Sequence, residues 1–182
     1  VDPEDGSALF DRFRIDATGF GGSPSGRLSI LSEEGSVYSL RLDYQHYETF
    51  SALPGWANPF AADGIVPGQH TWERDRDLFD LELQLLPGRT VTPILGYRYN
   101  RIDGPRTTNY HVGGDEFLIG SDLEETEEEF RAGLAFAAGG FRGSLIQGWR
   151  DFSSTDRSHL ALGGEGGNNS RPVLGVDVGL DA

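Results

Sequence analysis

Several residue types are missing from this chain. Its 182 residues include no cysteine and no methionine, and all 15 basic residues are arginine. The lack of cysteine excludes disulfide bonds, thiolate metal sites, cysteine nucleophiles and covalently attached c-type haem. No apolar run approaches the roughly 18 residues that a transmembrane helix needs. Strands are not excluded in the same way, because their apolar positions alternate with polar ones and disappear in an average.

A positive surface and the common catalytic motifs are missing as well. The formal net charge is −14, whereas a nucleic-acid partner requires a basic face for its phosphates. The chain contains no G-x-S-x-G, no Walker loop and no paired-carboxylate motif. We therefore expect no enzymatic activity, no cofactor and no nucleic-acid partner.

What the chain does contain is a repeated alternation of polar and apolar residues. Side chains of a strand point alternately to its two faces, so each segment can be divided by parity. Segment 77–85 places Phe79, Leu81 and Leu83 on one face and Asp80 and Glu82 on the other. Segments 37–47, 91–101, 130–136, 141–150 and 174–180 follow the same rule, and 12–16 and 27–30 follow it more weakly. The pattern predicts about eight strands.

The turns between these segments alternate in length. Short turns at 32–35, 86–89 and 137–140 alternate with long connections at about 18–26, 51–71, 102–123 and 154–171. Tight turns at one end and long external loops at the other are typical of a transmembrane β-barrel. We expect an all-β, antiparallel, up-and-down transmembrane β-barrel with residues 1–182 in a single domain. Eight strands match a small closed barrel, but the last strand is short, so a part of a larger barrel is the alternative.

A soluble sandwich or soluble barrel produces the same alternation. Three features favour a membrane. Charges of both signs occupy the polar positions, most strands are longer than those of soluble sheets, and aromatic residues lie near the ends of the apolar rows, as in interfacial girdles. Pro93 points the other way, because proline removes a hydrogen bond from the sheet. The girdle residues are Tyr44, Tyr47, Tyr97, Tyr99, Trp149 and Phe152.

Two segments resemble strands of known membrane proteins. Residues 90–99, with the sequence TVTPILGYRY, and residues 141–150, FRGSLIQGWR, resemble strands of Gram-negative outer-membrane β-barrel proteins. The resemblance implies location in the bacterial outer membrane, contact with the bilayer and its lipids, and a role as a pore or membrane scaffold. Small solutes or another envelope protein are the partners it implies. Its motifs are generic and single out no subfamily.

The charged positions of the strands form the predicted lumen. In a pore they would set charge selectivity; in a small closed barrel they would form an ion-pair network that only stabilises the fold. The predicted lumen-lining residues are Arg41, Asp43, Asp80, Glu82, Arg98, Arg131 and Arg150.

The connection at 50–72 is unusually apolar for an exposed loop. The candidate plug or partner-contact residues in it are Trp56, Phe60 and Trp72. We expect it to plug the barrel or contact a partner, the alternative being a loop that packs on itself. It also supports a different function, namely a soluble or surface-attached β-fold that binds a partner through loop 50–72.

An acidic run and four histidines are the remaining candidate sites. The run at 122–129 contains six carboxylates, which either attract cations or simply solvate a long loop and the strand extension beyond the membrane; it lacks the spacing of a calcium-binding loop. The histidines are scattered without metal-binding spacing. The sequence therefore leaves open whether this chain binds a metal.

Overall fold

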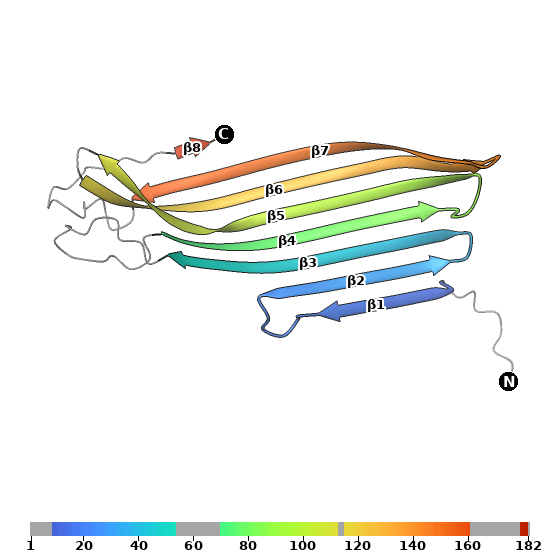
Figure 1. Ribbon diagram of the computed structural model, residues 1–182, viewed down its shortest axis with the longest axis horizontal. Helices are drawn as coiled ribbons and strands as arrows, with labels where there is room; N and C mark the ends of the chain where they lie inside the picture. Colours follow the sequence, from blue (N-terminus) through green and yellow to red (C-terminus); the bar gives the residue numbers. More distant parts are fainter. Residues whose placement is uncertain (1–8, 54–69, 113–114, 161–178, 182) are drawn as a thin grey trace. The chain divides into compact units, whose positions relative to one another are not determined.

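The protein is an antiparallel sheet. A computed structural model describes residues 9–53, 70–112, 115–160 and 179–181, and these form one eight-stranded sheet in which each strand lies beside its neighbours in sequence (Figure 1). The prediction of an all-β, up-and-down antiparallel fold is confirmed. The strands are β1 (Arg12–Thr18), β2 (Ser25–Glu34), β3 (Tyr38–Leu53), β4 (His70–Leu85), β5 (Val91–Val112), β6 (Asp115–Ala138), β7 (Phe141–Leu160) and β8 (Gly179–Asp181).

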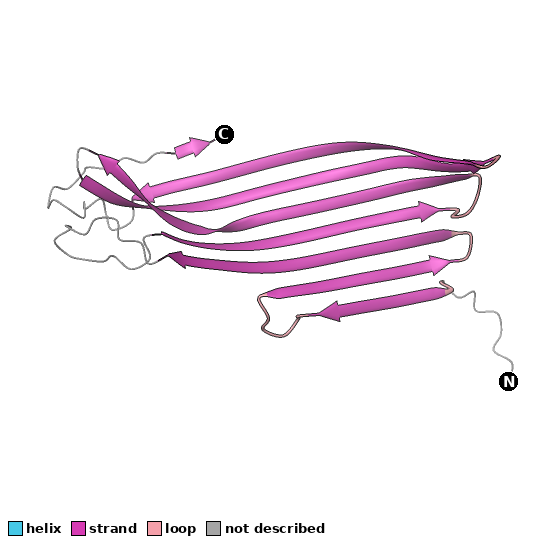
Figure 2. Ribbon diagram, in the orientation of Figure 1, coloured by secondary structure: helices cyan, strands magenta, loops and turns pink. Residues whose placement is uncertain are grey.

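Helices are absent from the described residues (Figure 2). Accordingly, the described part of the chain has no helix with the length and apolar character needed to cross a membrane.

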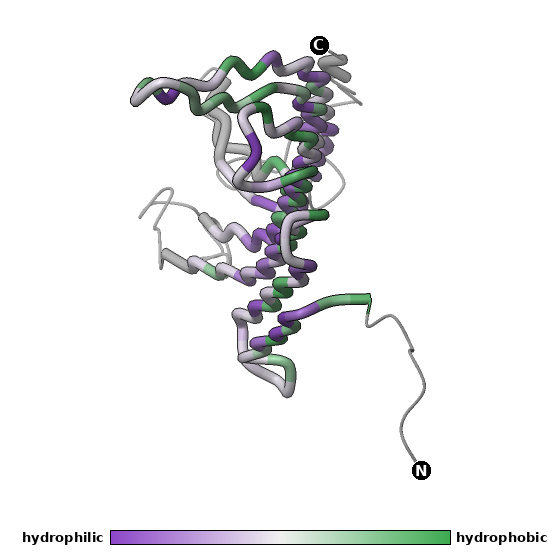
Figure 3. Tube along the Cα trace, turned by 90° about the vertical axis from the view of Figure 1, so that its right-hand side faces the viewer, coloured by the Kyte–Doolittle hydropathy of each residue, from purple (hydrophilic) through white to green (hydrophobic). Residues whose placement is uncertain are grey.

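Alternating hydropathy explains why these segments form strands. Hydrophilic and hydrophobic residues follow one another along the strands (Figure 3), which places opposite chemistry on the two faces of the sheet. Short turns reverse the chain between them. In the turn between β4 and β5, the Arg89 amide donates to the Leu86 carbonyl at 3.2 Å, and Gly88 has a φ of 81°, a conformation that favours glycine. Pro93 lies in β5, close to this turn.

The contacts divide the chain into two compact units. Unit 1 comprises residues 1–46, 77–100 and 127–152, and unit 2 comprises residues 47–76, 101–126 and 153–182. Strands β3 to β7 each contribute residues to both units.

One of the predicted long loops, at 102–123, is strand in nearly all of its described residues. The prediction of a loop at 102–123 is wrong, because β5 continues to Val112 and β6 begins at Asp115. The Asp103-Gly104-Pro105 sequence, which suggested a turn, lies within β5. Gly104 has a φ of 149°, and a Cβ on it would lie 2.0 Å from the Glu73 carbonyl oxygen. A side chain here would collide with the backbone of β4, whereas glycine allows β5 to continue beside it.

Strand also occupies the described ends of the loops predicted at 51–71 and 154–171. β3 reaches Leu53, β4 begins at His70 and β7 reaches Leu160. The remainder of the loops predicted at 51–71 and 154–171 lies outside the described residues.

The sheet is open. β1 and β8 stand at opposite ends of the strand order, so the described strands do not close into the predicted barrel. β1 pairs with β2 from Arg12↔Glu33 to Thr18↔Arg27, and β8 pairs with β7 only at residues 155–157. Outside these pairs, one long side of β1 and most of that side of β7 form edges of the described sheet.

No side chain of the described residues is fully buried. A soluble sandwich buries its apolar face under a second layer, whereas many large apolar side chains of this sheet are exposed. Leu145 is 76% exposed and Trp149 58% exposed. The described residues thus lack a second layer that would cover these apolar side chains.

Candidate functional site

Asp80 is at the centre of a charge network on one face of unit 1. This carboxylate on β4 accepts a hydrogen bond from Arg98 Nε on β5 at 2.8 Å. It also accepts hydrogen bonds from Arg131 Nη2 on β6 at 2.9 and 3.1 Å. One acidic group therefore connects three strands.

Glu129 extends the network to β7. Its carboxylate lies 4.0 Å from Arg98 Nη1 and 3.6 Å from Arg150 Nη2. Arg150 Nε also contacts Glu127 at 3.0 Å. Charges of alternating sign thus cross the sheet from β4 to β7 through Asp80, Arg98, Glu129 and Arg150, and each of these four contacts two opposite charges. We call Asp80, Arg98, Glu127, Glu129, Arg131 and Arg150 the charge network.

Two glycines make room for these long side chains. A Cβ on Gly96 would lie 2.9 Å from Arg131 Nε, and one on Gly148 would lie 2.8 Å from Glu129 Oε1. The guanidinium and the carboxylate therefore occupy space above bare backbone. Arg131 is 21% exposed, less than the other arginines of the network, and its Nε makes no hydrogen bond.

Aromatic side chains follow the opposite face of unit 1. The ring centroids of Phe79 and Tyr97 are 6.1 Å apart, and those of Tyr97 and Phe130 are 4.9 Å apart. These rings join β4, β5 and β6 on the face opposite the charge network. We call this the apolar face; it also includes Leu81, Leu83, Leu95, Leu134, Phe136, Leu145 and Trp149.

A polar cluster marks one end of the apolar residues on β3 and β4. Asp77 Oδ1 accepts a hydrogen bond from the Tyr44 hydroxyl at 2.6 Å and lies 2.9 Å from His46 Nδ1. Tyr44 follows Leu42 in β3, and Asp77 precedes Phe79 in β4. These groups therefore lie at the same end of the apolar residues in both strands.

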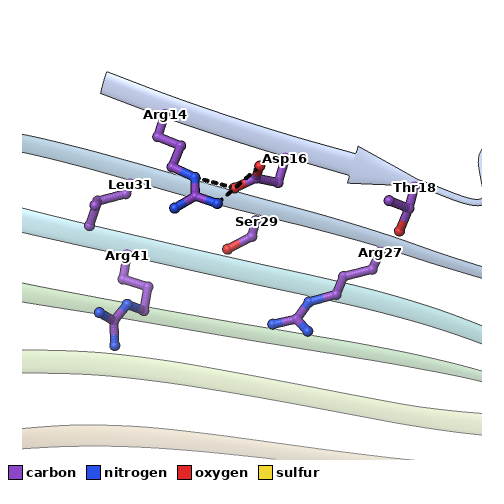
Figure 4. A pocket seen from close by; sticks show the side chains of 7 residues that line it. All are labelled: Arg14, Asp16, Thr18, Arg27, Ser29, Leu31 and Arg41. Atoms are coloured by element: carbon purple, nitrogen blue, oxygen red, sulfur yellow. Dashed lines mark hydrogen bonds and ion pairs between the residues drawn. The ribbon is translucent and has the colours of Figure 1, made fainter. Parts of the chain in front are cut away.

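A basic pocket lies on β1 to β3 of unit 1 (Figure 4). Arg14, Arg27 and Arg41 line a cavity of about 500 Å³ together with Asp16, Thr18 and Ser29. Arg14 Nε contacts Asp16 Oδ2 at 2.6 Å. Arg27 Nη2 contacts Asp43 Oδ1 at 3.2 Å, whereas Arg41 forms no ion pair with the described residues. We call this cavity the basic pocket.

Unit 2 has a smaller polar cluster. Arg106 on β5 donates from Nε to the Ser121 hydroxyl at 2.8 Å and from Nη2 to Asp156 on β7. Ser121 in turn donates to Asp156 Oδ1 at 2.6 Å. Ser121 is buried, with 3% exposure. Its hydroxyl accepts a hydrogen bond from Arg106 and donates one to Asp156. The cluster links three strands as a structural contact.

Arginines pair with much of the acidic run. It lies on β6 rather than in a loop, and besides Glu127 and Glu129 it places Glu124 at 3.4 Å from Arg101 Nη2. Arg101 Nε also lies 3.1 Å from Asp103, without the alignment of a hydrogen bond. No group of three or more metal-ligating side chains occurs among the described residues. Charge pairing between strands is thus the role that the contacts support.

The predicted lumen residues are all charged, but they do not all belong to one network. Asp80, Arg98, Arg131 and Arg150 belong to the charge network, Asp43 pairs with Arg27, and Arg41 lines the basic pocket. Glu82 accepts a hydrogen bond from Gln84 at 2.8 Å.

Sequence reasoning missed Glu127 and Glu129 as members of the network, since both were assigned to a solvated acidic run. The alternation of side chains along the strand could have identified them. Glu127 and Glu129 lie an even number of positions from Arg131, and Arg131 was assigned to the polar face.

Little of the predicted partner loop is described. Trp56 and Phe60 lie outside the described residues. Trp72 is 37% exposed, and the Arg74 guanidinium lies 5.4 Å from the centroid of its ring, a cation–π contact.

Comparisons with protein-family models, with curated proteins and with solved structures find no match to this chain.

Proposed function

We propose that this protein is an outer-membrane β-barrel that acts as a pore or membrane scaffold, with its apolar face against lipid and its charge network towards an aqueous interior. The observation that supports this most directly is the two-faced, single-layered sheet. Its exposed aromatic and aliphatic rows need an apolar environment, while its charges need water or one another. A bilayer outside and water inside meet both needs.

Strand length and the position of the aromatic residues agree with this proposal. A transmembrane strand requires about 9–11 residues, and β2 to β7 are 10 to 24 residues long; β1, with seven, is shorter. Tyr44, Tyr97 and Trp149 lie towards the same end of the apolar rows, and Phe136 and Phe141 towards the other. Two such girdles typically flank the lipid-facing band.

Closure is a requirement of the proposal. Unpaired backbone groups are costly in hydrocarbon, so the edge of β1 needs a strand partner in a membrane. Closure by strands of this protein and closure as part of a larger barrel both meet that requirement.

Ion selectivity tests the pore function. We expect Arg98→Ala and Arg41→Ala each to raise the potassium-to-chloride permeability ratio of the refolded protein in planar bilayers, because each removes a positive charge from the aqueous path. The rise should be about twofold or more at low salt, where charges are least screened. Arg41→Ala should fold normally, since Arg41 forms no ion pair with the described residues.

Arg89→Ala is the matched control, because Arg89 lies in the turn between β4 and β5. Its selectivity should equal that of the unmodified protein. Unchanged selectivity in both test variants would show that this face does not line the pore. A monodisperse, fully folded protein in plain buffer would instead support the soluble fold and contradict membrane insertion.

A further inference from the structure

The basic pocket has more positive charge than its own carboxylates neutralise. Three guanidinium groups line it, and two carboxylates contact them, Asp16 on Arg14 and Asp43 on Arg27. The uncompensated charge belongs to Arg41. In a chain with 29 acidic and 15 basic residues, a local excess of arginine is unexpected if these residues serve only to balance charge.

We propose that the basic pocket binds a small multivalent oxyanion of the phosphate class. Arginine presents several N–H donors in a planar fork that matches two oxygens of such an anion. Arg41 is exposed, and all its donors are unused by the described residues. It is the primary ligand, and Arg27 is the second, since its hydrogen bond to Asp43 uses only Nη2, at 3.2 Å.

Hydroxyl groups complete the site. In the antiparallel register of β1 and β2, Thr18 lies opposite Arg27 and Asp16 lies opposite Ser29. Both hydroxyl residues line the cavity, and each supplies a neutral donor to an oxyanion. Figure 4 shows Arg14 joined to Asp16, whereas Arg41 extends from β3 without a contact to the other side chains drawn.

Size and charge both favour a small ligand. The cavity of about 500 Å³ accommodates a phosphate or pyrophosphate with its water shell, and the site is open to solvent. Binding to exposed arginines is weak and sensitive to salt. A divalent or higher charge is therefore needed for occupancy above that of chloride.

This inference extends the proposed function by assigning a solute class to the charged face, but its test does not depend on conduction. Isothermal titration with inorganic pyrophosphate is performed in whichever solvent keeps the refolded chain monodisperse, detergent or plain buffer, with potassium chloride at constant ionic strength. A protein folded in plain buffer would overturn membrane insertion and still allow the anion site to be tested.

Three variants make the titration specific. We expect Arg41→Ala to weaken pyrophosphate binding about 10-fold and Arg41→Lys about threefold, because lysine retains the charge but loses the fork. Arg142→Ala on β7 should remain within about twofold of the unmodified protein; Arg142 is exposed and forms no ion pair with the described residues. Equal weakening in Arg41→Ala and Arg142→Ala would show only a bulk charge effect and overturn the site. An unmodified protein that binds no pyrophosphate would also overturn it.

Discussion

Asp80 is the side chain on which the charge network depends most, because it accepts hydrogen bonds from two arginines on two different strands. Such pairs are worth little when they are fully exposed. Here Asp80 is 36% exposed and Arg131 21%, so the contacts are partly shielded from water. Removing the carboxylate also leaves two guanidinium groups close together without their shared counter-charge.

Replacing Asp80 with asparagine should therefore destabilise the sheet. We expect Asp80→Asn to lower the free energy of unfolding by about 1–2 kcal/mol, measured by urea titration of the refolded protein. The matched control is Asp122→Asn, on β6, which is exposed and pairs with no arginine among the described residues. Equal effects of the two substitutions would show that the network adds nothing beyond general charge.

A glycine allows β6 and β7 to approach each other closely. Gly133 on β6 faces the neighbouring strand β7, and a Cβ there would lie 2.5 Å from the Leu145 carbonyl oxygen. That atom is backbone and cannot rotate away. On Gly143, a Cβ would lie 2.5 Å from the Phe136 ring, so an aromatic ring covers bare backbone at this position.

Gly133→Ala should force β6 and β7 apart. We expect a loss of about 2 kcal/mol in the free energy of unfolding, together with faster amide hydrogen exchange at positions of β6 and β7 near residues 133 and 145. Gly21→Ala is the control, because no atom lies within 4 Å of a Cβ at that position. Unchanged exchange in Gly133→Ala would contradict the close pairing of these strands.

The sequence predicted the strands well because their alternation is a local property. Parity alone separates Asp80, Glu82 and Arg98 from Phe79 and Tyr97, and the contacts place these two groups on opposite faces. The partners of each charge were not predictable in the same way. They depend on register between strands, and nothing in the sequence around Asp80 specifies two arginines 18 and 51 residues away.

The error at 102–123 has a physical cause. Aspartate, glycine and proline in succession favour a turn, yet β5 continues through them because Gly104 adopts a positive φ beside the β4 backbone. The acidic run was then assigned to a solvated loop and the strand extension beside it, which concealed Glu127 and Glu129 as partners of Arg150.

For the molecule as a whole, the proposed function requires the sheet to separate lipid from water. No second layer covers the apolar face among the described residues, and in this proposal lipid covers it. Because the chain has no cysteine, single cysteines can be introduced on either face without a competing thiol. Leu145 and Ser144 are adjacent residues of β7, and the parity of a strand directs them to opposite faces.

The decisive measurement is therefore fluorescence quenching of a bimane label attached at Leu145→Cys or Ser144→Cys in the protein refolded into lipid vesicles. We expect nitroxide-labelled acyl chains to quench the label at 145 strongly and the label at 144 weakly, and aqueous iodide to do the reverse. Equal quenching of the two positions by iodide, with no effect of the labelled lipid on 145, would contradict the assignment of the apolar face to the membrane.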